Sequence, residues 1–327
     1  MRITVVIPAK NAERTLPLLL DALLPQMAPD DEVFVIDDGS NDRTATIAQD
    51  RGATVFDTGD GGKGPATARN LGAYRGSGEV ILFLDADVIP VDGLVDHVRK
   101  RFSNDPNLMA LSGLYHPEPA NDRFFHHLKA AQVQVWFAKA KRFESFETAC
   151  AAIRKTAFEK AGGFDTAYTG ADVEDYEFGY SLGAPIELDR EMMVRHHFPD
   201  FAQNTRNYFH RSRQWAKLFL KRQRFDSVAT TGGDTAMAVT APLSIAMVWF
   251  GKAGRIELCV VLGYLLLVLW GVSKLPVVRR LVPKFGYLRS ALAWPLLWIG
   301  DSMAILGAAT GVLEAIADRI ETMLRRR

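Results

Sequence analysis

The sequence predicts a doubly wound α/β domain with a mainly parallel sheet, followed by a helical transmembrane domain. Apolar strand segments alternate with helical segments as far as residue 84, which is the pattern of βαβ units. Acidic residues stand directly after two of these strands, at positions 37–38 and 85–87. Long apolar blocks begin after about residue 229. These observations divide the chain into two parts.

The strands of the α/β part are short aliphatic runs, and the first helix has leucines at helical spacing. Residues 58–64 hold four glycines without periodicity, so we expect a loop near a ligand there. The expected order is strand 3–7, helix 12–24, strand 32–36, helix 41–52, strand 53–56, loop 58–64, helix 65–74 and strand 80–84.

The run from Val80 to Leu84 is typical of a central strand buried on both faces. Asp85 and Asp87 follow it, at the end of the strand where open α/β sheets bind ligands. Two such carboxylates can bind Mg²⁺, which takes its other ligands from water and phosphate groups. The pattern therefore indicates a metal-bound diphosphate, although an isolated Asp-x-Asp often only caps a loop.

Composition excludes some classes of protein. The net charge is +1, so we expect no nucleic acid partner. Cys150 and Cys259 form no disulfide framework or zinc pattern, and the first apolar run is too short for a signal peptide. The first domain should therefore lie in the cytosol. No Gly-x-Gly-x-x-Gly follows the first strand, and the glycine-rich loop lacks the order of a P-loop.

Four motifs together resemble a known family. Residues 5–11 read Val-Val-Ile-Pro-Ala-Lys-Asn, residues 35–44 Val-Ile-Asp-Asp-Gly-Ser-Asn-Asp-Arg-Thr, residues 68–73 Ala-Arg-Asn-Leu-Gly-Ala and residues 83–87 Phe-Leu-Asp-Ala-Asp. Their order is similar to that of the family 2 glycosyltransferases, over roughly residues 1–215. The resemblance implies the GT-A fold, whose mainly parallel sheet is Rossmann-like, and a nucleotide-activated sugar as donor.

The resemblance also implies roles for single residues. Asp85 and Asp87 would hold Mg²⁺ or Mn²⁺ on the diphosphate, with His196 as a further ligand, although His196 could equally be a surface histidine. Arg69 would lie near the base, and UDP is the expected nucleotide. The residues implied to bind the nucleotide sugar in the first part are Pro8, Ala9, Asn11, Asp37, Asp38, Arg69, Asp85, Ala86 and Asp87.

Residues 170–178 place four carboxylates within six positions. Carboxylates crowded in this way raise the pKa of at least one of them toward neutrality, which suits a general base. By resemblance, Glu174 and Asp175 form the catalytic pair, and Asp175 takes the proton from the acceptor hydroxyl. The alternative is that these acids only stabilise a helix amino terminus, as we expect for Asp172 and Glu177.

Residues 208–219 are basic and aromatic. By their position in the chain, though only loosely by residue identity, they resemble the Gln-x-x-Arg-Trp element of processive members of the family. Arg211 and Arg213 could then contact the leaving diphosphate, and Trp215 the acceptor. Alternatively, a helix near 206–225 simply lies at the headgroup level.

We expect a catalytic domain over 1–225 and a membrane domain over 226–327. The apolar blocks are 236–250, 258–272 and 291–313, and residues 274–289 form a basic interfacial segment. Asp301 is costly in hydrocarbon, so we expect it to face another helix or a headgroup. A buried globular helix pair is the alternative. The side of the arginine-rich carboxyl terminus remains open.

These features predict a metal-dependent, inverting glycosyltransferase. It would move a sugar from a nucleotide-diphosphate sugar to the hydroxyl of a membrane lipid or lipid-linked acceptor, as a multi-pass protein of the inner (plasma) membrane with a cytosolic catalytic domain. The alternatives are a polyprenyl-phosphate glycosyltransferase, whose acceptor needs no base, and a non-catalytic nucleotide-binding membrane scaffold. The sequence leaves open whether the chain forms a homo-oligomer.

Overall fold

A computed structural model describes the chain except for residues 60, 140–144, 171–172, 224, 226–230 and 326–327. The chain divides into two compact units. The first contains Met1–Asp122 and Arg142–Phe198, and the second contains Arg123–Lys141 and Pro199–Arg327. Each unit is therefore made of two separate stretches of chain.

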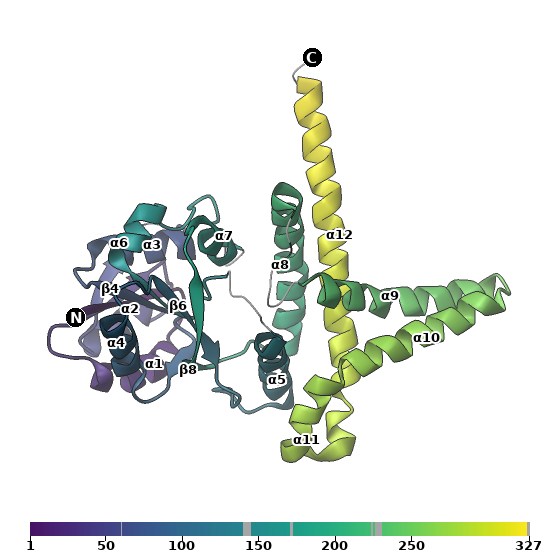
Figure 1. The fold of residues 1–327 in the computed structure, drawn as a ribbon, viewed down its shortest axis with the longest axis horizontal. Coiled ribbons are helices and arrows are strands. Elements are labelled where there is room, and N and C mark those ends of the chain that lie inside the picture. The colour runs from purple at the N-terminus through teal and green to yellow at the C-terminus, as the bar shows by residue number, and fades with distance from the viewer. Residues whose placement is uncertain (60, 140–144, 171–172, 224, 226–230, 326–327) are drawn as a thin grey trace. The chain divides into compact units, whose positions relative to one another are not determined.

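An eight-stranded sheet forms the centre of the first unit, in the order β3-β2-β1-β4-β7-β6-β8-β5 (Figure 1). The neighbours β3, β2, β1 and β4 are parallel, as are β6 and β8. Strand β7 is antiparallel to β4 and β6, and β5 is antiparallel to β8. The strands are β1 (Ile3–Ala9), β2 (Glu32–Asp37), β3 (Thr54–Asp57), β4 (Val80–Leu84), β5 (Val88–Pro90), β6 (Ala110–Tyr115), β7 (Cys150–Arg154) and β8 (Ile186–His196).

Helices connect and cover these strands, as the alternation in the sequence predicts. Each strand of the amino-terminal half lies within a few residues of its expected place, whereas the short β5 was not predicted. The helices of this unit are α1 (Leu16–Leu23), the 3₁₀ turn η1 (Leu24–Gln26), α2 (Thr44–Asp50), α3 (Pro65–Arg75), α4 (Leu94–Asn104), α6 (Lys155–Ala161) and α7 (Glu174–Ser181).

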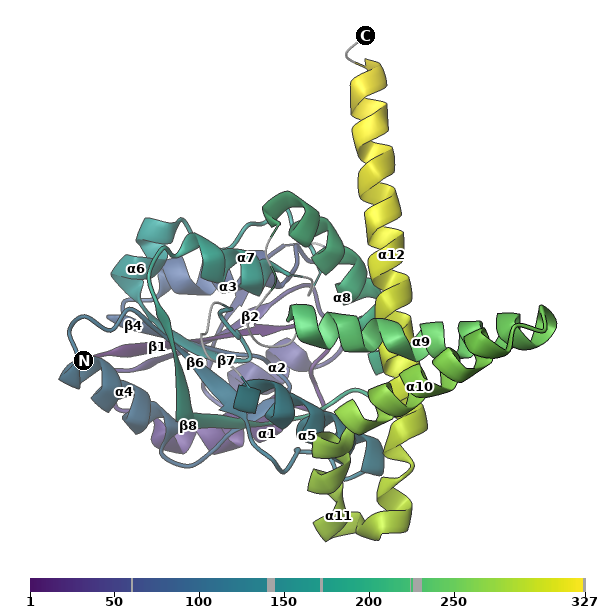
Figure 2. The same ribbon diagram turned by 45° about the vertical axis from the view of Figure 1, so that its right-hand side comes forward.

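Strand register brings the acidic motifs to one edge of the sheet. All five residues of β4 are buried, which confirms the prediction of a central strand. Ala9 of β1 lies beside Asp37 of β2, and Val6 of β1 lies beside Phe83 of β4. Because these strands are parallel, their carboxyl ends meet at the same edge (Figure 2).

The second unit consists of helices. Two of them, over Gly232–Ala253 and Ala293–Glu321, are long and apolar enough to cross a membrane. Helices α10 and α11 meet the same criterion only as a pair, bent by 55°. The described residues thus contain two or three candidate spans, in agreement with the expected two to three. The helices are α5 (Phe124–Lys139), α8 (Phe201–Arg222), α9 (Gly232–Ala253), α10 (Glu257–Ser273), α11 (Leu275–Ser290) and α12 (Ala293–Arg325).

Packing assigns α5 and α8 to the second unit, since α5 contacts α11 and α8 contacts α12. The compact units therefore divide after residues 122, 141 and 198, and the last of these boundaries lies before the expected one at 225. Residues 274–289, expected as an interfacial stretch, lie mostly in α11, where Gly286 interrupts the helical backbone. The assignment of residues 1–225 to a catalytic domain stays a prediction.

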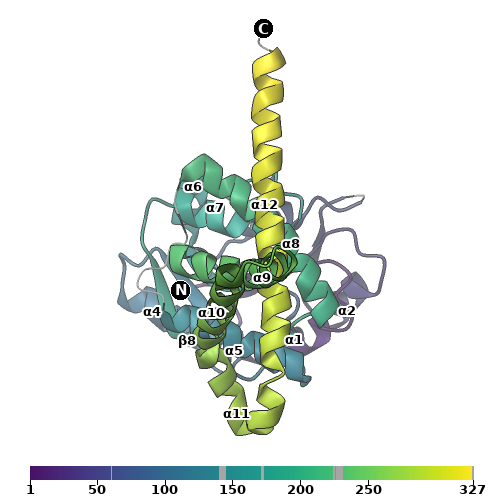
Figure 3. The same cartoon turned by 90° about the vertical axis from the view of Figure 1, so that its right-hand side faces the viewer.

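Glycines on α12 allow α8 to pack closely against it (Figure 3). A Cβ atom at Gly307 would lie 2.1 Å from the carbonyl oxygen of Phe209, and one at Gly311 would lie 2.2 Å from that of Arg213. The two glycines are four residues apart and so share one helix face, as in small-residue contacts between membrane helices. The backbone of α8 occupies the space of the missing side chains.

Asp301, the acid expected to face another helix, does so within this unit. It accepts a hydrogen bond of 2.8 Å from Trp270 Nε1 on α10 and pairs with Lys274 Nζ at 2.6 Å. The contact compensates a carboxylate within an apolar helix.

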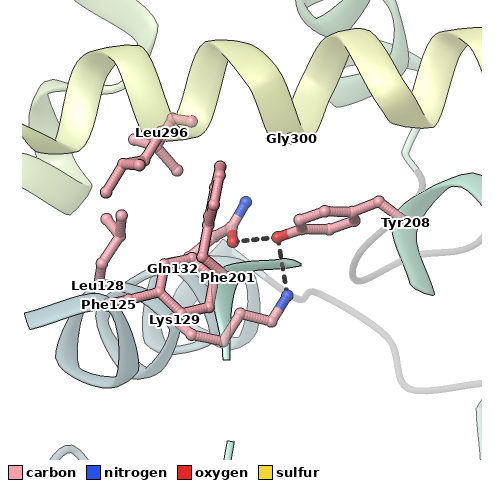
Figure 4. Close-up of a pocket in the computed structure, with 9 residues that line it drawn as sticks. Phe125, Leu128, Lys129, Gln132, Phe201, Tyr208, Leu296 and Gly300 are labelled. Atoms are coloured by element: carbon pink, nitrogen blue, oxygen red, sulfur yellow. Dashed lines mark hydrogen bonds between the residues drawn. The ribbon is translucent and has the colours of Figure 1, made fainter. Parts of the chain in front are cut away.

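A small pocket between α5, α8 and α12 holds a second polar cluster (Figure 4). Lys129 Nζ donates to the Tyr208 hydroxyl at 2.8 Å, and this hydroxyl donates to Gln132 Oε1 at 2.5 Å. Burial, together with the charge of Arg211, lowers the pKa of Lys129 to about 7 against the opposing charge of Asp301.

Replacing Gly307 with alanine tests the close packing of α8 on α12. The new methyl group would collide with the Phe209 carbonyl, and such overpacking costs about 1–3 kcal/mol. We expect a lower midpoint of thermal unfolding for the detergent-solubilised protein. Gly233→Ala is the control, because among the described residues the atom that a Cβ there would approach is Thr231 Oγ1, 3.9 Å away. Equal midpoints for the two variants would contradict the packing described.

Candidate active site

The loops after β1 and β2 are tied together at the sheet edge. Asn11 has a positive φ of 52°, its N–H donates to Ser40 Oγ at 2.9 Å, and its Oδ1 accepts from the N–H of Asn41 at 2.8 Å. Asp37 Oδ1 accepts from the N–H of Ser40 at 3.0 Å. Pro8 and Ala9, at the end of β1, pair with Ile36 and Asp37. The residues predicted to line the nucleoside pocket therefore lie together.

Asp38 holds the glycine-rich loop. Its carboxylate is buried and accepts hydrogen bonds from Thr58 Oγ1 at 2.7 Å, from the N–H of Lys63 at 2.6 Å and from the N–H of Gly64 at 3.0 Å. Gly64 has a φ of 90°, and a Cβ there would lie 2.4 Å from the Thr169 carbonyl oxygen. The predicted contact of Asp38 with a nucleoside remains a prediction, whereas its role in the loop follows from these bonds.

The chain turns sharply at the Asp-x-Asp motif. The N–H of Val88 donates to the carbonyl of Asp85 at 3.3 Å, so that β4 ends and β5 begins across Ala86 and Asp87. Asp85 and Asp87 keep 28% and 43% of their side-chain surfaces exposed, which leaves both carboxylates within reach of a ligand.

Antiparallel pairing brings His196 to this turn. Val88 of β5 lies opposite His196 of β8, and His196 Nε2 is 3.6 Å from Asp87 Oδ1. Desolvation by the surrounding protein raises the pKa of Asp87, and the charge of Asp85 adds to this while His196 opposes it. A cation bound at Asp87 would compensate the charge of its carboxylate.

The donor set at Asp87 suits a divalent cation. One carboxylate and one imidazole lie together, and His196 Nδ1 is buried and has no hydrogen-bond partner among the residues that the structure describes. Mn²⁺ accepts both types of ligand. However, the part of the chain that the structure describes contains no group of three or more His, Cys, Asp or Glu side chains able to hold a metal ion. The trio of Asp85, Asp87 and His196 therefore stays a prediction.

Two sets of contacts near the Asp85–Asp87 motif could not be predicted from the sequence. The N–H of His197 donates to the carbonyl of Asp87 at 2.8 Å, and burial lowers the pKa of the His197 side chain. The His196 ring stacks on Phe198 with ring centroids 4.6 Å apart and meets Tyr115 edge to face at 5.0 Å. These aromatic rings fix the orientation of His196.

Arg69 joins the two acidic motifs. It lies on α3 with 4% of its surface exposed. Its Nη2 donates to Asp85 Oδ1 at 2.8 Å, and its Nη1 donates to Glu174 Oε1 at 2.9 Å. Burial alone would lower the pKa of Arg69, but the charges of Asp85 and Glu174 raise it above its ordinary value. The resemblance to the family implied that Arg69 lies near the base. No local pattern in the sequence predicts that Arg69 bonds to both Asp85 and Glu174.

The acidic pair begins α7, as expected. Glu174 is 3% exposed, whereas the Asp175 side chain is half-buried. Glu177 accepts a hydrogen bond from the Tyr168 hydroxyl at 2.8 Å. Asp172, the other acid of this stretch, lies outside the described residues. Of the two predicted catalytic carboxylates, Asp175 is therefore the more accessible.

The remaining predicted residues belong to α8 in the second unit. Arg211 is exposed. Arg213 pairs with Glu314 of α12 at 2.7 Å, and Trp215 stacks on Phe219 with ring centroids 5.5 Å apart. Contacts of Arg211, Arg213 and Trp215 with donor or acceptor stay predictions.

This arrangement of strands and acidic turns is the GT-A fold, which confirms the expected fold class. The chain is similar over 95% of its length to the mannosyltransferase PcManGT from Pyrobaculum calidifontis, solved in complex with GDP-Man and Mn²⁺. The TM-score is 0.58 with 20% sequence identity, and 87% of that chain is covered.

Residues 4–162 match the family model of Glycosyl transferase family 2, so the chain carries a domain of this family. It is 43% identical over 91 residues to the 4,4'-diaponeurosporenoate glycosyltransferase of Staphylococcus haemolyticus, across 26% of this chain and 24% of that protein. It is 29% identical over 204 residues to the probable glycosyltransferase YdaM of Bacillus subtilis, across 57% and 48%. The matches thus span about half or less of these two relatives.

Replacing Asp38 with asparagine tests its role in the glycine-rich loop. The amide puts an NH₂ group where one carboxylate oxygen accepts from the N–H of Gly64 at 3.0 Å, so that two donors face each other. All three donors must then share the single remaining oxygen, at a cost of about 1–3 kcal/mol. We expect hydrogen exchange in residues 61–64 to become about tenfold faster. The exposed Asp50→Asn, at the end of α2, is the control. Unchanged exchange in Asp38→Asn would show that other contacts hold the loop.

Proposed function

We propose that this chain is an inverting glycosyltransferase that moves a sugar from a nucleotide-diphosphate sugar to the hydroxyl of a membrane lipid or lipid-linked acceptor. One observation carries the proposal. Arg69 and Asp85 lie inside the family 2 match over residues 4–162, and Arg69 bonds both to Asp85 and to Glu174, which lies beyond that match. A site for the leaving diphosphate and a site for a general base would thus adjoin.

The donor proposal rests on the sheet edge. Backbone turns after β1, β2 and β4 meet there, and nucleotides bind at this edge in open α/β sheets. The glycosyltransferase from P. calidifontis binds GDP-Man, whereas UDP is the nucleotide expected from the motifs. Both nucleotides therefore belong in a first donor panel.

In the proposed reaction, Asp175 accepts the proton of the acceptor hydroxyl while the oxygen attacks the anomeric carbon. The bond from that carbon to the diphosphate breaks, and the configuration inverts. Asp175 suits this role because it lies in the first turn of α7 and its side chain is half-buried, so that an acceptor can reach it. A general base of this kind contributes about 10²–10⁴-fold to the rate.

We include a divalent cation, Mg²⁺ or Mn²⁺, in the proposal. Mn²⁺ is present in the complex of the P. calidifontis enzyme, and Asp87 with His196 offers suitable ligands. When bound, the ion would stabilise the charge of the departing diphosphate. Asp87 would supply the carboxylate ligand, and Asp85 would keep its bond to Arg69.

A lipid acceptor is proposed from the second unit and from a relative. The same chain carries two helices able to cross a membrane, and the S. haemolyticus relative is named for glycosyl transfer to diaponeurosporenoate. We therefore propose a multi-pass protein of the inner (plasma) membrane whose family 2 domain lies in the cytosol.

Replacing Asp175 with asparagine tests the reaction. Turnover should fall by about 100-fold or more, because the amide cannot accept the proton. The measurement is nucleotide release from UDP- and GDP-sugars by the detergent-solubilised protein, with Mn²⁺ or Mg²⁺ and with or without extracted lipids.

Glu177→Gln is the matched control, since it removes a carboxylate from the same turn of α7, and its turnover should stay close to that of the unmodified protein. Near-normal turnover of Asp175→Asn would contradict a hydroxyl acceptor and favour a phosphate acceptor, which needs no base. Absence of metal-dependent nucleotide binding would favour a non-catalytic scaffold.

A further inference from the structure

Arg69 contacts both acidic motifs, and its side chain is almost fully buried. Arg69 and Glu174 are 4% and 3% exposed, and they stand 105 positions apart in the sequence. The guanidinium offers its two terminal nitrogens to carboxylates on different elements, one after β4 and one on α7. Its planar fork can hold both at once, which a lysine ammonium cannot do with the same geometry.

The carboxyl-terminal half of α7 is held by different contacts. Phe178 packs in an aromatic cluster, with ring centroids 4.3 Å from Phe164, 5.2 Å from Phe146 and 5.4 Å from Phe158. This packing anchors the helix but lies one turn after Asp175. The first turn is held by the Arg69–Glu174 bond, by the bond of Glu177 to the Tyr168 hydroxyl, and by the N–H of Phe146, which donates to the Asp175 carbonyl at 3.4 Å. Of these contacts, the Arg69–Glu174 bond acts on the residue directly before the proposed base.

Glu174 itself is poorly placed to accept a proton. Its Oε1 is bonded to Arg69, and its side chain is 4% exposed, so an acceptor hydroxyl has little access to it. Its charge is compensated by the guanidinium, and removing Arg69 would leave Glu174 buried without this compensation. The pair therefore has the properties of a structural connection.

We propose that Arg69 is a positioning residue that couples the Asp85–Asp87 turn to the first turn of α7, with Glu174 as its partner. This inference rests on the proposed function of the same site. Arg69 holds Asp85 on one side and, through Glu174, sets the place of Asp175 on the other. The distance between leaving group and base would then be fixed by one side chain, and a displacement of about 1 Å can cost about 100-fold in rate.

Hydrogen exchange provides a test that does not depend on activity. In Arg69→Met, the amides of residues 174–178 should exchange faster, because the first turn of α7 loses its anchor, while those of α6 should not change. The control is Arg75→Met on the same helix, whose exposed guanidinium lies over the Phe56 ring at 4.5 Å. Equal exchange of α7 in both variants would overturn the proposal.

Kinetics separate positioning from substrate binding. Arg69→Met should lower kcat by about 100-fold and leave the donor KM within about threefold, and Arg69→Lys should recover part of the loss. A raised donor KM with unchanged kcat would overturn the proposal, because Arg69 would then bind the nucleotide.

Glu174→Gln keeps the size and one acceptor oxygen, and it remains informative if Arg69→Met fails to fold. We expect its turnover to stay within about tenfold of the unmodified protein, against about 100-fold loss in Asp175→Asn. Equal losses, with unchanged hydrogen exchange of residues 174–178 in Glu174→Gln, would make Glu174 the proton acceptor and overturn the proposal. If the unmodified protein transfers no sugar while α7 exchange responds to Arg69→Met, the proposed function fails but the coupling stands.

Discussion

The bridge from Asp85 through Arg69 to Glu174 connects two parts of the first unit that the sheet alone does not join. Asp85 follows β4, whose position is fixed by five buried residues, whereas Glu174 opens a helix of eight residues. The guanidinium compensates both carboxylates, so its loss would leave Glu174 buried without this compensation. The relative positions of both acidic motifs depend on it.

The sheet supplies the other constraint. Because β2, β1 and β4 are parallel and adjacent, the turns after them lie at one edge of the sheet. The strand order alone therefore brings Asp37, Asp38 and Asp85 to this edge. Antiparallel pairing in the other half of the sheet adds a histidine to this edge. Pairing of β5 with β8 places His196 opposite Val88, next to Asp87. A mixed sheet thus assembles a site from distant parts of the chain.

Much of this fold is predictable from local patterns. The apolar run Val80–Leu84, which is buried in the structure, and the acids after it stand in nine consecutive residues, and residues 4–162, which contain the four motifs, match the family model. The bridge between Arg69 and Glu174 is different, because no local pattern names the partner of an arginine 105 positions away. The packing of α8 on α12 is predictable only in part. Gly307 and Gly311 indicate a helix face of small residues, but the sequence does not say which helix packs against it.

An experimental structure with nucleotide and Mn²⁺ bound would show the place of the Arg69 side chain most directly. We expect Arg69 to remain bonded to Asp85 and Glu174 while the ion lies on Asp87. A structure in which Arg69 turns to the nucleotide and releases Glu174 would contradict it.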